Sequence, residues 1–239
     1  MTGDAAFHTT RWSLIASARD PRQPTARESL AVLCKMYWYP LYVFVRRRGS
    51  DAETSADLIQ GFFVELLEGD LLNLVDREKG KFRSYLLGAL KHFISNEWHR
   101  AHTQKRGGRT PVVSLEGAEE RYGLEPSHQL SPEHLYERRW ALTLLEQANE
   151  QLRQQYEEAG KGQQFTELRD LIAGPLADRS YAEIGQKLGM SEDAIKTAVH
   201  RLRKQYRQIL KARIADTLES TSEIDEELRH LYSAVSIVG

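Results

Sequence analysis

The basic side chains near the C-terminus are the residues of this chain with the clearest chemistry. Between Lys196 and Arg213 the sequence has seven Lys and Arg residues and no Asp or Glu. They are Lys196, Arg201, Arg203, Lys204, Arg207, Lys211 and Arg213. Local charge governs binding to a polyanion, so the near-neutral total of −1 does not argue against such binding. The phosphate backbone of a nucleic acid is the ligand that this pattern favours.

An acidic stretch follows the basic one. From Asp216 to Glu227 there is no Lys or Arg, and the carboxylates are Asp216, Glu219, Glu223, Asp225, Glu226 and Glu227. Apolar residues at helical spacing (Ile224, Leu228, Leu231, Tyr232) predict a helix here. Two interpretations stay open. The six carboxylates screen the basic residues as an autoinhibitory segment, or the helix only adds to the core.

Two helical patterns that meet at a glycine position the basic residues. The sequence from 180 to 205 reads SYAEIGQKLGMSEDAIKTAVHRLRKQ. Gly189 is expected to end the first helix in a left-handed conformation. Ser191 is expected to cap the second, with Glu192 and Asp193 favourable in its first turn. A short helix, a tight turn and a second helix with a polar, basic face are typical of a helix-turn-helix.

In a helix-turn-helix the second helix enters the major groove of DNA. Lys204 and Arg207 lie far along this helix, and we expect them to contact phosphates rather than bases. A helical hairpin with a solvated basic face is the alternative. The candidate DNA contacts are Ser191, Asp193, Lys196, Thr197, His200, Arg201, Lys204 and Arg207.

The rest of the chain predicts an all-α protein. Helices are expected over 25–48 (kinked or restarted at Pro40), over 51–68 with Asp51 as N-cap, and over 82–101. Helical periodicity is lost over 102–132, where only 111–115 suggests an extended segment, and it returns from Pro132. We therefore expect two helical domains, 25–105 and 133–213, joined by a flexible linker at 106–132. Residues 1–24 are an N-terminal extension and 214–239 an acidic C-terminal helix or tail.

Motifs of catalysis are not found in the sequence. It has no Walker loop, nucleophile elbow, HExxH or cysteine cluster, so we expect no enzyme, no cofactor and no metal. The single cysteine, Cys34, lies in an apolar pattern and is expected to be buried. We see no secretory signal and no apolar run long enough to insert into a membrane. A cytoplasmic, nucleoid-associated protein is the expectation.

Three motifs in order resemble a known family. They are YPLYVFVRRRG (39–49) with SADLIQGFFVELLE (55–68), DREKGKFRSYLLGALKHFISNEWHR (76–100), and the helix pair from 180 to 205. The first two resemble region 2, and the third resembles region 4, of bacterial RNA polymerase sigma factors of the extracytoplasmic-function (ECF) group. The resemblance covers about 25–105 and 135–213. The chain departs from the family at Gly61, where members usually have an acidic residue.

The resemblance implies partners and roles. The partners would be promoter DNA and core RNA polymerase, contacted at the clamp helices of β′ and the flap of β; whether an anti-sigma factor binds is open. The polymerase-docking residues would be Asp57, Leu58, Gln60, Phe62 and Phe63. We expect one of the two phenylalanines to face the core and the other to help the surface.

The loop 76–84 would capture an extruded base of the −10 element, and the helix after it would bind single-stranded DNA. The residues implied are Lys79, Lys81, Arg83, Lys91, His92, Asn96, His99 and Arg100. Trp98 lies on the apolar stripe, so we expect it in the core. Lys105, Arg106 and Arg109 would line the polymerase channel, or they form a solvated basic linker.

The function expected is that of a sigma factor, which reads the −35 element with the second domain and melts the −10 element with the first. Two alternatives remain. One is a stand-alone DNA-binding regulator, and the less favoured one is a helical protein-interaction module.

Overall fold

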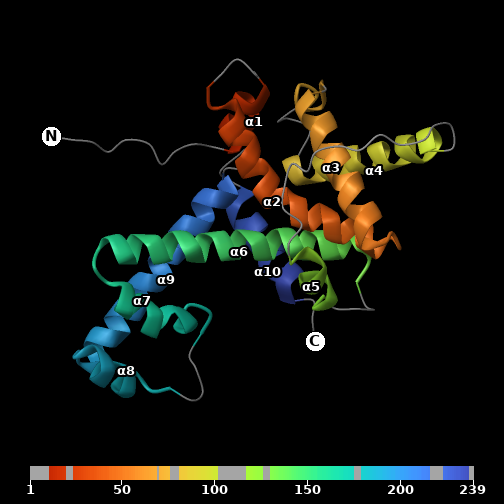
Figure 1. The fold of residues 1–239 in the computed structure, drawn as a ribbon. Coiled ribbons are helices and arrows are strands. Elements are labelled where there is room, and N and C mark those ends of the chain that lie inside the picture. The colour runs from red at the N-terminus through yellow and green to blue at the C-terminus, as the bar shows by residue number, and fades with distance from the viewer. Residues whose placement is uncertain are drawn as a thin grey trace. The chain divides into compact units, whose positions relative to one another are not determined.

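The structure is a computed structural model, and it describes residues 11–19, 24–68, 70–75, 81–101, 117–125, 130–174, 179–215 and 223–236. These residues form helices and their connections, with no strand among them, as the expected all-α class requires (Figure 1). The chain divides into two compact units. The first unit comprises residues 1–143 and 214–239, and the second comprises residues 144–213.

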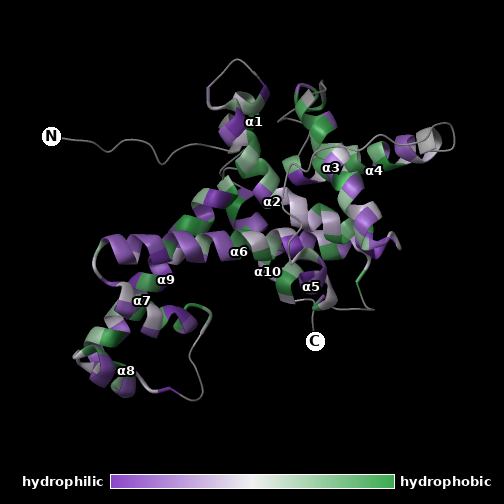
Figure 2. Ribbon diagram, viewed as in Figure 1, coloured by the Kyte–Doolittle hydropathy of each residue, from purple (hydrophilic) through white to green (hydrophobic). Residues whose placement is uncertain are grey.

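The first unit is built on three long helices and the beginning of a fourth. They are α2 (Ala26–Arg47), α3 (Ala52–Glu68), α4 (Phe82–Ala101) and the N-terminal part of α6 (Pro132–Glu158). The short elements α1 (Arg11–Arg19), η1 (Asp70–Leu72), α5 (Ala118–Gly123) and α10 (Ile224–Ser236) complete it. Figure 2 shows hydrophobic and hydrophilic residues interspersed along these helices, as expected of helices that bury one face.

Local signals explain where these helices begin. Asp51 caps α3 as predicted, because its Oδ1 accepts a hydrogen bond of 2.7 Å from the Thr54 N–H. That bond lowers the pKa of Asp51. The predicted helix over 82–101 is confirmed as α4.

Helix α2 passes through Pro40 as one element and does not restart there. Its residues from Met36 to Val45 are all buried, so their packing offsets the backbone hydrogen bond that proline cannot donate. Cys34 is buried as expected, and burial raises the pKa of its thiol to about 11. The thiol therefore stays protonated and unreactive near neutral pH.

Part of the expected linker is a helix held against the first unit. In α5, the Glu119 carboxylate accepts hydrogen bonds from Tyr42 (2.6 Å) and from Nε of Arg46 (3.0 Å). Burial and this carboxylate raise the pKa of Tyr42 to about 12, so the phenol keeps the proton that it donates. Two residues beyond α5, the buried Glu125 accepts a hydrogen bond from Tyr39 and is paired with Arg139. These contacts join α5 to α2 and α6.

The second unit contains the C-terminal part of α6, then α7 (Gly162–Leu168), η3 (Arg169–Leu171), α8 (Tyr181–Leu188) and α9 (Glu192–Ala215) up to Arg213. Its buried residues come from every one of these elements and include Leu152, Phe165, Leu171, Ile184 and Leu202. The boundary between the units falls inside α6, between Thr143 and Leu144, whereas the sequence pattern suggested a junction over 106–132. A continuous helix hides such a boundary, because its periodicity does not change where its packing partners change.

The N-terminal extension and the acidic tail each contain a helix. Helix α1 was not predicted; its Arg19 donates a hydrogen bond of 2.8 Å to the carbonyl of Leu72. The helix expected in the acidic tail is confirmed as α10, with Leu228 and Leu231 buried and Tyr232 exposed.

Candidate nucleic-acid interface

The turn between α8 and α9 has the geometry that the sequence predicted. Ser180 and Glu183 form a capping box at the start of α8, with reciprocal hydrogen bonds of 3.2 and 3.0 Å. Gly189 ends α8 with φ 64° and ψ 34°, the left-handed conformation. Ser191 caps α9, because its Oγ accepts a hydrogen bond from the Ala194 N–H. Both ends of the turn are therefore fixed by local contacts.

Gly185 is a residue of this turn that sequence reasoning missed. The Met190 N–H donates a hydrogen bond of 2.9 Å to the Gly185 carbonyl, which brings the two backbones together. A Cβ on Gly185 would lie 2.5 Å from the Met190 carbonyl oxygen. The available signal was a second glycine inside an otherwise helical pattern, which often marks a close backbone approach.

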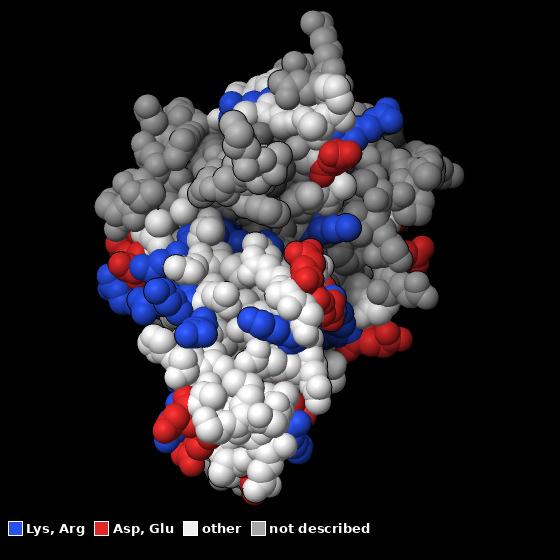
Figure 3. All heavy atoms as spheres, turned by 90° about the vertical axis from the view of Figure 1, so that its left-hand side faces the viewer, with Lys and Arg blue, Asp and Glu red and all other residues white. Residues whose placement is uncertain are grey.

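Helix α9 buries its apolar stripe and exposes its polar side. Ile195, Val199 and Leu202 are buried. All the candidate DNA contacts of this region are exposed: Ser191, Asp193, Lys196, Thr197, His200, Arg201, Lys204 and Arg207. Figure 3 shows several Lys and Arg side chains close together on the face that it draws, with Asp and Glu side chains at their border.

Not every cation of α9 is equally available to a ligand. Lys196 is paired with Glu192 at 2.8 Å and Asp193 at 3.3 Å, and the hydrogen bonds to these carboxylates raise its pKa. Arg203 donates to the Leu171 carbonyl at 2.8 Å, and Arg213 donates to Gln147 and Gln151 of α6. The last two arginines are half-buried, and these hydrogen bonds hold α9 within the second unit.

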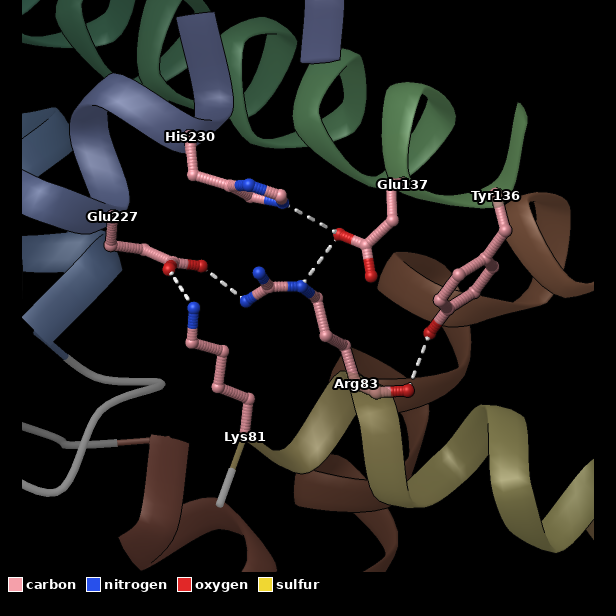
Figure 4. Close-up of polar contacts among 6 residues, drawn as sticks. All are labelled: Lys81, Arg83, Tyr136, Glu137, Glu227 and His230. Atoms are coloured by element: carbon pink, nitrogen blue, oxygen red, sulfur yellow. Dashed lines mark hydrogen bonds and ion pairs between the residues drawn. The ribbon is translucent and has the colours of Figure 1, made fainter. Parts of the chain in front are cut away.

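Two predicted DNA contacts of the first unit are instead bound to a carboxylate. Lys81 Nζ lies 2.5 Å from Glu227 Oε2, and Nη1 of Arg83 binds Glu227 Oε1 (Figure 4). The side chains of Arg83 and Glu227 are only 3% and 1% exposed, whereas that of Lys81 is 37% exposed. Arg83 is therefore buried in this structure, and its predicted contact with a DNA phosphate requires that Glu227 move away.

Arg83 is also held from helix α6. Its Nε donates to Glu137 Oε2 at 2.8 Å, and its guanidinium lies 4.0 Å from the ring centroid of Trp140. The phenol of Tyr136 donates to the Arg83 carbonyl at 3.0 Å (Figure 4). The sequence pattern could not reveal this cluster, because its members come from three segments far apart along the chain.

Electrostatics explains why these charges are tolerated in a buried place. Burial alone would lower the pKa of Arg83, but Glu137 and Glu227 outweigh it and raise that pKa. Burial alone would raise the pKa of Glu227, but Arg83 and Lys81 outweigh it and lower that pKa. Arg83 and Glu227 are therefore both charged near neutral pH, although both side chains are buried.

Other predicted contacts of α4 lie on an exposed surface. Lys91, His92 and Asn96 are exposed, although Lys91 is paired with Glu133 at 2.8 Å. Trp98 is 67% exposed, so its expected place in the core is wrong. It lies near the C-terminal end of α4. An exposed aromatic ring such as that of Trp98 suits stacking on an unstacked base.

A shallow cavity of ≈ 380 Å³ lies beside this surface. His92 and Asn96 share it with Glu65, Leu71, Tyr85, Gly88, Ala89 and Phe93. Apolar and polar side chains both line it.

The expected polymerase-docking residues divide into two groups. Asp57 is exposed and Leu58 is half-buried. Gln60, Phe62 and Phe63 are buried, so the expectation that one phenylalanine faces the surface is wrong. The ring of Phe62 lies edge-on to Phe63 and Phe93, with centroids 5.9 and 5.8 Å apart. Gln60, Phe62 and Phe63 are therefore part of the core in this structure. Of the five expected docking residues, Asp57 and Leu58 are left to form a surface.

Several predicted residues cannot be placed. Lys79, Lys105, Arg106 and Arg109, and the segment 111–115, lie outside the described residues. His99 and Arg100 belong to α4, but their side chains are not described. Within the described part of the chain, no helix is long and apolar enough to cross a membrane, and no group of three or more His, Cys, Asp or Glu could hold a metal ion.

Comparisons with known proteins add no relative. No protein-family model, no curated protein and no solved structure matches this chain.

Proposed function

We propose that this protein is a transcription initiation factor of the sigma type, which binds promoter DNA through α9. The observation that carries the proposal is the exposed, basic face of α9 behind a turn fixed by Gly185, Gly189 and Ser191. A helix presented in this way matches the recognition helix of a helix-turn-helix, which lies in the major groove. The resemblance of three ordered motifs to ECF sigma factors extends the proposal from DNA binding to initiation.

In this proposal the second unit reads the −35 element and the first unit opens the −10 element. His200 and Thr197 lie on the exposed face of α9 where base edges would be read, and Lys204 and Arg207 contact phosphates. In the first unit, the exposed Trp98 stacks on an unpaired base. The polymerase partner binds at Asp57 and Leu58.

The first test is run-off transcription with the full chain and bacterial core polymerase, on genomic fragments that include the region upstream of its own gene. Lys204→Gln should weaken initiation, because one phosphate contact is lost. Lys161→Gln is the matched control, since it removes the same charge from an exposed site of the second unit outside α9. Equal loss with both variants, or no initiation with any fragment, would contradict the proposal.

A stand-alone DNA-binding regulator is the second candidate. It is favoured by the burial of Gln60, Phe62 and Phe63, which leaves a smaller surface for polymerase than the family pattern implies. Asp57→Asn separates the two candidates. In a sigma factor it abolishes co-purification with core polymerase and leaves duplex binding intact, whereas in a stand-alone regulator it changes neither.

A further inference from the structure

The cluster around Glu227 is a set of charges that the proposed function leaves unexplained, and His230 of α10 also reaches it, with its Nε2 3.3 Å from Glu137 Oε2. Lys81 and Arg83 carry two positive charges, and Glu137 of α6 neutralises one of them. Glu227 neutralises the other from α10, a segment 144 positions further along the chain than Arg83. Without α10, Lys81, Arg83 and Glu137 together carry a net charge of +1. These residues could then bind one anion.

The bonds of Arg83 show how that anion is held. The guanidinium divides its donors, with Nε on Glu137 and Nη1 on Glu227, and the Trp140 ring covers one of its faces. A planar guanidinium binds a carboxylate and a phosphate by the same donor geometry. Lys81 donates to the second oxygen of Glu227, so both carboxylate oxygens are bound as two oxygens of a phosphodiester would be.

The packing of helix α10 places the Glu227 carboxylate at Lys81 and Arg83. Leu228, Leu231 and Ala234 are buried, while Glu223 and Glu226 remain exposed. Among the acidic residues of α10 and its N-terminal flank whose burial is described, Glu227 is thus the buried one, seated next to the apolar stripe. The hypothesis that the acidic tail screens the basic face of α9 stays a prediction, and these contacts support a separate one, in which a single carboxylate occupies the basic pair of the first unit.

We propose that α10 is an intramolecular plug, in which Glu227 occupies a phosphate site formed by Lys81 and Arg83 and must leave before single-stranded DNA binds there. This inference rests on the proposed function only for the identity of the nucleic acid. Glu137 and Trp140 stay with Arg83 when α10 leaves, so the site keeps its shape and exchanges one anion for another.

The test compares Glu227→Gln with Glu226→Gln in the full chain. Both substitutions remove one carboxylate from α10, but only the first removes it from the basic pair. The probe is fluorescein-labelled oligothymidylate, measured by anisotropy over a range of salt concentrations, with circular dichroism to verify helix content. Glu227→Gln should bind about tenfold more tightly than the native chain, the gain expected of a charge-assisted contact. Its dependence of log K on log salt should steepen by about 0.7 for each phosphate gained.

A double variant locates the gain. Lys81→Gln combined with Glu227→Gln should return affinity towards the native value, because the opened site has lost a cation. Equal affinity of Glu227→Gln and Glu226→Gln, or a gain that persists without Lys81, would overturn the plug.

Two further measurements keep the result interpretable. Duplex binding through α9 is measured in parallel, with Lys204→Gln as the variant expected to weaken it. Failure of the proposed function would appear in duplex binding, whereas failure of the plug would appear in the binding of oligothymidylate by Glu227→Gln. If Glu227→Gln does not fold, hydrogen exchange of α10 in the native chain replaces it. Saturating oligothymidylate should increase exchange over 224–236, and unchanged protection would overturn the proposal.

Discussion

The backbone at Met190 lies so close to Gly185 that a Cβ at Gly185 would be 2.5 Å from the Met190 carbonyl oxygen. Gly185→Ala should therefore destabilise the α8–α9 turn. Overpacking costs about 1–3 kcal/mol, and a backbone atom yields less easily than the end of a side chain. Hydrogen exchange of the α8 and α9 amides should accelerate, and the affinity for duplex DNA should fall as the exposed face of α9 is displaced. Native protection in this variant would show that the turn can open without cost.

Gly88 offers the opposite case in the middle of α4. A Cβ there would meet nothing within 4 Å, and the residue is helical without a positive φ. Gly88→Ala should raise the free energy of unfolding by roughly 0.5–1 kcal/mol, because alanine loses less backbone entropy in a helix. Urea denaturation followed by circular dichroism measures this. A lower free energy of unfolding would mean that the fold depends on the present shape of the cavity beside Gly88.

The sequence predicted the helices of this protein better than it predicted the contacts between them. Hydrophobic spacing and caps such as Asp51 and Ser191 are local signals, and the elements they predicted are present. The exposure of the α9 face followed from the same periodicity. The prediction that Trp98 lies in the core was wrong for a related reason. Periodicity assigns a residue to one face of a helix, but it does not show where along the helix the core ends.

Long-range partners were beyond the sequence. Basic residues at 81 and 83 looked available to a polyanion, and nothing local to them indicates that Glu137 and Glu227 bind Arg83. The buried pair Phe62 and Phe63 shows a related limit: two adjacent aromatic residues on a helix can both be buried when neighbouring helices cover a wide arc. Charge and aromatic patterns thus predict a kind of chemistry, while the fold decides which groups are accessible.

The contact of α5 with α2 gives a third prediction. Glu119→Gln keeps an oxygen that can accept from Tyr42 but removes the ion pair with Arg46. Half of the Glu119 side chain is exposed, so the change in stability should be at most about 1 kcal/mol. Its effect should be local: the amides of α5 should exchange faster, and those of α4 should not.

Glu120→Gln is the control for this change, because it removes the same charge from an exposed neighbour in α5. Faster exchange of the α5 amides in both variants would show that the charge of the helix, and not the ion pair with Arg46, causes the effect. An unchanged α5 in Glu119→Gln would show that packing alone holds the segment.

The pH dependence of stability gives a fourth prediction, centred on Glu227. Burial tends to raise the pKa of this carboxyl group, but Arg83 and Lys81 outweigh burial and hold the pKa below the ordinary 4.5. A carboxyl group whose pKa is lower in the folded state binds fewer protons there than in the unfolded state. Its contribution is therefore fully present above about 4.5 and is lost as the pH falls through the folded-state pKa.

Glu227→Gln should consequently be less stable than the native chain at neutral pH, by about 1.5–3 kcal/mol for the loss of hydrogen bonds to charged groups. The two unfolding free energies should converge as the pH falls through the folded-state pKa of Glu227, because protonation removes from the native chain the same charge that the substitution removes. Urea denaturation at a series of pH values gives both curves, and Glu226→Gln should run parallel to the native one. A difference between Glu227→Gln and the native chain that stays constant with pH would mean that Glu227 stabilises α10 by its shape and not by its charge.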